Sequence, residues 1–294
     1  MDLKVGLISS HNTEELKQEL EEEGIINEQF DHEQIYFVEG LFYLAQDKPL
    51  EDFDIIIIRR FAEEFDLEHF AFALNLWTEL ERKGCWLVNS YDAAMICTDK
   101  METLMKLQQI GVPVPKTIVV PTHDYELVLE AFNSLGEDII IKPLFGSKGR
   151  GILRIKDSAN LQSVVDLYQD CQKVLYLQEF LSPTRNSHFE DIRIFQAGDE
   201  ILGSMKRSSK TWITNFSRKG KVKDYNPSEE MKELSSRSLK ATKAFYAGVD
   251  IIETASGPVV IEVNSFPGWQ GLQQATGKNI PRLLIQKILS EYRK

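Results

Sequence analysis

The chain has 294 residues, of which 43% are hydrophobic, and this is enough for packed cores in two or three lobes. Its 34 Lys and Arg residues against 45 Asp and Glu residues give a formal net charge of −11, which argues against general nucleic-acid binding because that binding rewards a basic face. No apolar run approaches the ~20 residues that span a bilayer, and the N-terminus carries no basic leader with an apolar core. The three cysteines are well separated and odd in number, so we expect free buried thiols. We therefore expect a cytoplasmic protein without a membrane or nucleic-acid partner.

The first third of the chain alternates between strand and helix patterns. Thr13 is expected to begin an amphipathic helix that ends at Gly24. Strands that alternate with helices predict a parallel sheet with both faces covered. The expected buried strands are 5–9, 35–38, 55–58 and 85–90, and the expected helices are 13–24 and 65–83.

The pattern changes after Tyr91. A helix over 99–111 precedes a stiff hinge, 112–116, in which Pro113 and Pro115 exclude helix. The following strands look more antiparallel, and 197–200 is predicted to be a hairpin turn. The expected strands are 117–120, 138–142, 151–156, 174–180, 191–207, 249–255 and 259–264, and the expected helices are 124–135, 227–247 and 279–292.

A glycine-rich stretch, KPLFGSKGRG at 142–151, lies between two expected strands. It matches neither the Walker spacing nor the dinucleotide fingerprint, which opens a helix. Between strands it predicts either an exposed hairpin turn or a flap whose backbone N–H groups close on phosphates. Lys142 favours the flap, because a lysine at the end of an apolar strand is costly to bury unless an anion meets it. The candidate flap residues are Gly146, Ser147, Lys148, Gly149, Arg150 and Gly151.

Glu262 and Asn264 end an apolar strand, with one valine between them. Residues i and i+2 of a strand share a face, so these side chains point together while Val263 faces the core. Asp250 is expected at the start of the neighbouring strand, where Gly248 leaves its approach open. Two carboxylates and an amide oxygen suit Mg²⁺. The alternative is that Asp250 caps a strand and the other two mark a polar sheet face.

The order and spacing of several segments resemble the ATP-grasp superfamily and, within it, the RimK-like glutamate ligases. The segments are TDKMETLMKL, VPVPKT, IIIKPLFGSKGRGI, LQEFL, DIR, MKR, TNFSRKG, AGVDII and IEVNSFPGWQGLQQATG. The resemblance implies a mixed α/β and α+β chain with the ATP-grasp fold, in which a parallel-sheet lobe precedes two α+β lobes that clasp ATP. We expect an N-terminal α/β domain at 1–97, a central subdomain with the flap at 98–180 and a C-terminal subdomain with the metal site at 181–294.

The same resemblance implies roles on the nucleotide side. Lys100 and Lys142, together with the flap, would hold the phosphates of ATP. Glu179 and Phe180 would form the adenine hinge, and Asp191 would lie near the nucleotide.

The resemblance also implies a metal site and an acyl-transfer site. Asp250, Glu262 and Asn264 would bind two Mg²⁺ ions, with Mn²⁺ as a substitute. Arg207 and Asn215 would be catalytic, facing the γ-phosphate and the acyl centre.

The substrate-side loop departs from the family pattern. Many relatives carry an arginine two positions before the asparagine and a Gly-Gly pair after it, whereas this chain has Ile213-Thr214-Asn215 and Lys219-Gly220. The stretches PLFGSKGRGI and NSFPGWQGLQ are more similar to ligases that add glutamate to a pterin or deazaflavin coenzyme than to the one that acts on a ribosomal protein.

The resemblance implies an ADP-forming carboxylate–amine ligase. A substrate carboxylate would attack the γ-phosphate to give an acyl phosphate, which an amine then converts to an amide. The expected reaction adds L-glutamate to a carboxylate-bearing acceptor, either a coenzyme or a peptide. Two alternatives are a peptide-forming ligase that uses another amino acid and a non-catalytic nucleotide-binding regulatory module. The presence of the phosphate lysine and all three metal ligands argues against the second, and a homo-oligomer is left open.

A basic run at 206–221 holds six cations and no acid in sixteen residues. Such a run is either a solvated loop or a surface for an acidic substrate. Because it begins at Arg207, we expect it to close over the acceptor, with Trp212 or Phe216 as a stacking face.

Overall fold

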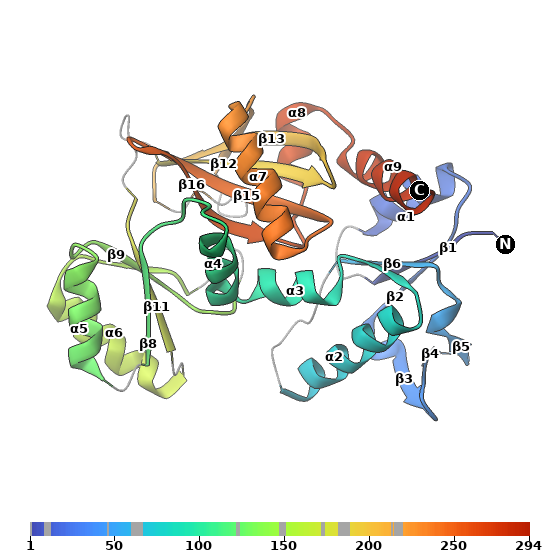
Figure 1. Ribbon diagram of the computed structural model, residues 1–294, viewed down its shortest axis with the longest axis horizontal. Coiled ribbons are helices and arrows are strands. Elements are labelled where there is room, and N and C mark those ends of the chain that lie inside the picture. Colours follow the sequence, from blue (N-terminus) through green and yellow to red (C-terminus); the bar gives the residue numbers. More distant parts are fainter. Residues whose placement is uncertain are drawn as a thin grey trace.

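The protein forms three lobes that lie in a row in the computed structural model (Figure 1). The structure describes residues 2–8, 13–45, 47–59, 67–121, 124–146, 151–171, 174–181, 189–212, 214 and 220–294. Of these, no helix combines the length and apolar character needed to cross a bilayer. Cys85 and Cys97 are free thiols, as expected from the sequence.

A parallel four-stranded sheet, ordered β2-β1-β6-β7, is the centre of the N-terminal lobe. Its elements are β1 (Lys4–Ile8), α1 (Thr13–Glu22), β2 (Ile26–Phe30), β6 (Ile55–Ile58), α2 (Leu67–Arg82) and β7 (Trp86–Val88). All four isoleucines of β6 are fully buried. Ile55 and Ile57 pack in the core that includes α1, whereas Ile56 and Ile58 pack in the core that includes α2. This confirms the predicted parallel sheet covered on both faces.

The segment 35–38 is a strand as expected, but the expectation that it is buried is wrong. This segment is β3 (Ile35–Val38), which pairs antiparallel with β4 (Leu41–Leu44) in a small separate sheet completed by β5 (Lys48–Pro49). Only Ile35 of β3 is buried, and Phe37 is 54% exposed. The turn between the strands has positive φ at Glu39 and Gly40, which forms a tight hairpin instead of a crossover. The fourth strand of the parallel sheet is β2, which the sequence did not predict because three of its five residues are polar. Short 3₁₀ turns at His32–Gln34 and Leu50–Asp52 flank the small sheet.

The second lobe is an antiparallel sheet ordered β10-β9-β11-β8, with two helices on one face (Figure 1, green). Its elements are β8 (Thr117–Pro121), α5 (Tyr125–Ser134), β9 (Ile139–Lys142), β10 (Leu153–Ile155), α6 (Ser158–Cys171) and β11 (Val174–Glu179). The sequence did not predict α6. β9 and β10 pair antiparallel, with Leu153 opposite Ile141, so the glycine-rich stretch lies between paired strands as expected.

The third lobe is a five-stranded antiparallel sheet ordered β14-β13-β12-β15-β16. Its elements are β12 (Phe189–Ala197), β13 (Glu200–Ser209), β14 (Lys221–Asp224), α7 (Glu229–Thr242), β15 (Tyr246–Thr254) and β16 (Gly257–Asn264). The predicted hairpin turn at 197–200 is confirmed, with Gly198 at φ +56°. The helix expected to reach residue 247 instead ends at Thr242. Lys243 turns left-handed, and Tyr246 begins a strand because its fully buried ring packs against Phe195.

Two pairs of helices join the lobes. α3 (Tyr91–Thr98) and α4 (Lys100–Gln109) lead out of the first lobe, and the Asp99 side chain caps α4 by accepting from the backbone N–H groups of Met101 and Glu102. α8 (Gln270–Thr276) and α9 (Ile280–Tyr292) return the C-terminus to the N-terminal lobe, where α9 packs on α1 (Figure 1). The three-domain division at 97/98 and 180/181 stays a prediction, and the C-terminal helices share a core with the first lobe.

Candidate active site

A cleft of about 1030 Å³, measured out to its open mouth, lies between the sheet of the second lobe and the sheet of the third lobe. Nine of the predicted catalytic, nucleotide-binding and metal residues line it: Lys100, Lys142, Gly146, Glu179, Phe180, Asp191, Arg207, Asp250 and Glu262. Asn264 and Gly151 are not part of its lining. The remaining predicted residues, namely Ser147, Lys148, Gly149, Arg150 and Asn215, lie outside the described part of the chain.

Two lysines face the cleft from the side of the second lobe. Lys142 ends β9, and its Nζ donates to Oε1 of Gln178 on β11 at 2.7 Å. Burial lowers the pKa of Lys142 to about 8, partly opposed by the charge of Glu262. Lys100 Nζ donates to the carbonyl of Gly146 at 2.9 Å, and burial lowers its pKa as well. Neither lysine forms an ion pair with any residue that the structure describes, so both favour the arrival of an anion.

The predicted hinge is fixed by backbone pairing. Glu179 exchanges bonds with Lys116: its N–H donates to the Lys116 carbonyl at 2.9 Å, and its carboxylate accepts from the Lys116 N–H at 2.7 Å. Arg154 of β10 lies over the Phe180 ring, 3.3 Å from the centroid, and Asp138 holds that guanidinium through two bonds of 2.7 and 2.6 Å. These contacts fix the positions of Glu179 and Phe180, and their role as the adenine hinge stays a prediction.

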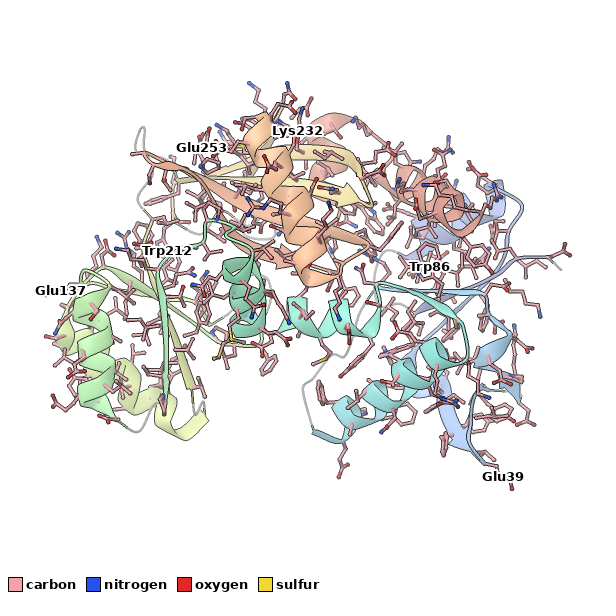
Figure 2. All side chains as sticks on the ribbon, viewed as in Figure 1. Glu39, Trp86, Glu137, Trp212, Lys232 and Glu253 are labelled. Atoms are coloured by element: carbon pink, nitrogen blue, oxygen red, sulfur yellow. The ribbon has the colours of Figure 1, made fainter. Side chains whose placement is uncertain are left out.

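The hinge end of the cleft is apolar and aromatic. The ring of Trp212 contacts the ring of Phe180 edge to face, with 6.4 Å between the ring centroids. In Figure 2, Trp212 lies between the second lobe and the sheet of the third lobe. The apolar lining of the cleft also includes Pro115, Ile140, Pro143, Ile152, Leu181, Phe189, Ile252 and Ile261. Such a slot suits a flat ring. Trp212 thus lies beside the predicted nucleotide hinge, and its expected role toward the acceptor stays a prediction.

A buried ion network occupies the opposite wall. Arg207 of β13 stands directly opposite Asp191 of β12 and donates to both of its carboxylate oxygens, at 2.7 Å from Nε to Oδ1. It also contacts Asp250 of β15, at 2.8 Å from Nη2 to Oδ2. Arg193, two residues beyond Asp191, donates to both oxygens of Asp250 at 2.6 Å.

The network favours the charged forms of Asp250 and Arg207, whereas burial raises the pKa of Asp191 against the charge of Arg207. Burial alone would raise the pKa of Asp250, but Arg193 and Arg207 outweigh it and hold that pKa below the ordinary value. The Asp250 and Asp191 carboxylates in turn raise the pKa of Arg207 against its own desolvation. A charge pair in a dry site holds fixed positions because each partner would be costly to leave alone.

The metal candidates lie on paired strands. Asp250 is directly opposite Glu262, and Gly248 is opposite Asn264, whose amide nitrogen lies 3.5 Å from the Gly248 carbonyl. Two expectations about this region are wrong. Asp250 lies in the middle of β15, because the strand begins earlier, at the buried Tyr246. Gly248 does not leave an open approach, since a Cβ there would lie 3.0 Å from Cβ of Pro267.

The oxygens of this set differ in availability. Glu262 makes no ion pair with the described residues, whereas three arginine contacts occupy most of the acceptor capacity of Asp250. The described residues contain no group of three or more His, Cys, Asp or Glu that could hold a metal, so any ion here relies on two carboxylates and one amide.

Sequence reasoning overlooked three residues of the site. Gln178 holds Lys142, Arg193 holds Asp250, and Arg154 supports Phe180. The sequence could have predicted Arg193 as a site residue, because it follows Asp191 by two positions and the two side chains therefore share one face of the strand. The other two depend on cross-strand neighbours, which the sequence does not specify.

Comparison with known proteins decides the family. Residues 97–288 match the RimK-like ATP-grasp domain. The chain belongs to this family. It is 29% identical over 98% of both chains to tetrahydromethanopterin:alpha-L-glutamate ligase of Methanococcus maripaludis. It is 34% identical to the ligase of the same name from Methanocaldococcus jannaschii, over 69% of this chain and 70% of that protein.

Solved structures confirm the ATP-grasp fold. The RimK-like chain superposes on the ATP-grasp ligase PsnB, solved with a minimal precursor, Mg and ADP, with a TM-score of 0.75 at 17% identity, covering 99% of this chain and 98% of that one. A RimK domain protein from Sphaerobacter thermophilus gives a TM-score of 0.73 at 18% identity, covering 97% and 98%. The predicted fold class and ligase assignment are thus confirmed, and the protein is an ATP-grasp ligase.

Proposed function

We propose that this ligase uses ATP and Mg²⁺ to join L-glutamate to a carboxylate-bearing acceptor through an acyl phosphate. The observation that carries the proposal is the cleft itself, in which two lysines without an ion-pair partner among the described residues face carboxylates and a fixed arginine on the other wall. The choice of glutamate is supported by the names of the relatives in two methanogens, both glutamate ligases.

The oxygen donors on β15 and β16 fit Mg²⁺. Glu262 offers a carboxylate that makes no ion pair within the described part of the chain, Asn264 an amide oxygen and Asp250 its one remaining acceptor position. Bound there, Mg²⁺ would neutralise the phosphate oxygens and align the transferring group. We propose two ions for this set, with Mn²⁺ as a substitute.

The side chains of this site would act by holding charge in place. Lys100 and Lys142 would bind phosphate oxygens of ATP, and Arg207 would stabilise the charge that spreads over the transferring phosphoryl group. An acceptor carboxylate oxygen attacks the γ-phosphorus and ADP leaves. The glutamate nitrogen then attacks the acyl carbon, the C–O bond to phosphate breaks and the nitrogen gives up a proton. No side-chain nucleophile is required.

The test is an assay of ADP release that depends on both L-glutamate and an acceptor, with the product identified by mass. Tetrahydromethanopterin and a short peptide with a free C-terminus are the first acceptors to try, and L-aspartate and D-glutamate serve as competing amino acids. We expect ADP and a product larger by one glutamyl residue. Products with another amino acid would favour the peptide-forming alternative. Mg²⁺-dependent ADP binding without turnover on any acceptor would favour a regulatory module.

A further inference from the structure

The N-terminal lobe contacts the chain immediately after the last predicted metal ligand. Asn89 follows β7 at the carboxyl edge of the parallel sheet and is fully buried. Its amide nitrogen donates to the carbonyls of Ser265 at 2.7 Å and Tyr246 at 2.9 Å, and its oxygen accepts from the N–H groups of Phe245 and Tyr246. An asparagine side chain has two donor hydrogens and two main acceptor positions, so all of them are used. Asn89 thus ties the first residue after Asn264 to the start of β15.

Arg59 makes a second connection from the next strand of the same sheet. It follows β6 and is 8% exposed. Its Nη2 donates to the Pro267 carbonyl at 2.8 Å, its Nη1 donates to the Tyr246 hydroxyl at 3.0 Å, and its guanidinium carbon lies 4.0 Å from the centre of the Trp269 ring.

Arg59 is held by directed hydrogen bonds and by stacking on an aromatic ring and not, among the described residues, by pairing with a carboxylate. Within the described part of the chain it has no carboxylate partner, and its buried Nε has no hydrogen-bond partner. Burying a charge under these conditions is costly. Only a planar guanidinium can lie on an indole and direct two separate hydrogen bonds, so lysine cannot replace it.

The segment that these residues hold packs against the metal strands. Pro267 lies over Gly248, at 3.0 Å from the position a Cβ would take, and Gly248 is opposite Asn264. Arg193, which holds Asp250, approaches the same point, at 3.4 Å from its Cδ. The segment 265–268 is therefore enclosed between Arg59 and the strands that carry Asp250 and Asn264.

We propose that Arg59 and Asn89 are positioning residues for the metal end of the active site. They fix the backbone of 265–268 and so aim Asn264 and keep Arg193 against Asp250. The proposal rests on the proposed function for the metal role of Asn264. It assigns to the N-terminal lobe a part in the chemistry, although none of the described side chains of that lobe is part of the cleft lining.

The test compares Arg59→Lys with wild type by titrating Mg²⁺ into protein held at a fixed ADP concentration and following ADP affinity by calorimetry. ADP affinity without a divalent ion should stay within twofold of wild type, because the lysines and hinge belong to other lobes. The Mg²⁺ concentration for half-maximal tightening should rise about tenfold, as when the supports of metal ligands are removed. Backbone amides of 265–269 should exchange hydrogen faster in the variant.

Arg282→Ala is the matched control. Arg282 of α9 pairs with Glu19 and Glu22 of α1 across the same contact between the N-terminal lobe and the C-terminal segment, but away from Pro267. Its loss should leave the Mg²⁺ midpoint unchanged. Tyr246→Phe removes the hydroxyl that accepts from Arg59 and donates to the Ile58 carbonyl at 3.2 Å, and should raise the midpoint two- to threefold even if Arg59→Lys fails to fold.

The outcomes separate the two proposals. A wild-type Mg²⁺ midpoint in both Arg59→Lys and Tyr246→Phe, or an equal shift in Arg282→Ala, would reduce Arg59 to a stabilising contact and overturn the inference. If the ADP affinity of the wild-type protein does not change with Mg²⁺ concentration, this result would instead overturn the proposed metal site, and the inference with it.

Discussion

The two walls of the cleft carry charge in opposite ways. On the side of the second lobe, and among the residues that the structure describes, Lys142 bonds to a neutral amide and Lys100 to backbone carbonyls, and burial lowers the pKa of both. On the side of the third lobe, Arg207 lies between two carboxylates. One wall therefore has cations that lack an anion, and the other has an internally balanced network.

The lysine wall should therefore contribute mainly to ligand binding, and the arginine wall mainly to the positioning of charge before the reaction. A buried lysine without an anion gains stabilisation when a phosphate arrives, so it favours ligand binding over the empty state. A network that is already paired contributes little new binding energy, but it holds an arginine where charge develops. Variants on the two walls should thus affect different quantities.

The largest effect is expected on the metal strand. Glu262→Gln keeps the shape but removes a negative charge facing the cleft, and should lower kcat by about three orders of magnitude, since metal-based charge stabilisation contributes several kcal/mol. Thermal unfolding should be unchanged, because Glu262 makes no ion pair with the described residues. Glu253→Gln, an exposed acid on the neighbouring β15 (labelled in Figure 2), is the control and should retain full turnover.

Lys142→Met tests the lysine wall. Removing the phosphate cation should lower kcat/KM for ATP by about two orders of magnitude, in the range found when one charge-stabilising donor is removed. The free energy of unfolding without ligand should stay the same or rise, because a buried ammonium is replaced by an apolar chain of similar length. A marked loss of ligand-free stability would contradict this description of the wall.

Arg207→Met tests the opposite wall and should reverse the pattern. It leaves the buried Asp191 without its arginine and should cost about 3 kcal/mol of unfolding free energy in denaturant titrations. ADP affinity of the folded fraction should change little. Equal stability losses for Lys142→Met and Arg207→Met would remove the distinction between the walls.

A smaller effect is expected at Trp212. Its contact with Phe180 predicts that Trp212→Ala raises KM for ATP about fivefold, by roughly 1 kcal/mol of lost aromatic contact. The sequence interpretation instead predicts an effect on KM for the acceptor. Initial rates with each substrate varied in turn distinguish the two sides.

The smallest expected effect is the uptake of a proton by Lys142 when ATP binds. Because the pKa of Lys142 is lowered to about 8, the free protein carries it mostly neutral at pH 9 and mostly charged at pH 7. Phosphate favours the charged form, so ATP binding should take up most of a proton at pH 9 and little at pH 7. Calorimetry in two buffers of different ionisation enthalpy measures the uptake, which should shrink in Lys142→Met.

The sequence predicted the architecture better than the site geometry. The isoleucines of β6, the hairpin turn at Gly198 and the strands around the glycine-rich stretch were readable because local patterns specify them. The segment at 35–38 was misassigned because a hairpin turn, not its own hydrophobicity, decides its partner.

Within the site, residue types were easier to predict than partners. Lys142, Asp250 and Glu262 were found, since unusual polar residues in apolar strands are conspicuous. The bonds of Asp250 to Arg193 and Arg207 depend on strand register across three strands, and the packing of Pro267 on Gly248 brings together a residue beyond β16 and one within β15. Neither follows from local sequence.

The most direct test of the account is the fate of an acceptor carboxylate oxygen. An acceptor that supports turnover is prepared with oxygen-18 in its reacting carboxylate, and the released phosphate is analysed by mass. If the cleft forms an acyl phosphate, one labelled oxygen will appear in inorganic phosphate for each amide made, together with ADP. Unlabelled phosphate, or AMP and pyrophosphate as products, would contradict the mechanism proposed for this cleft.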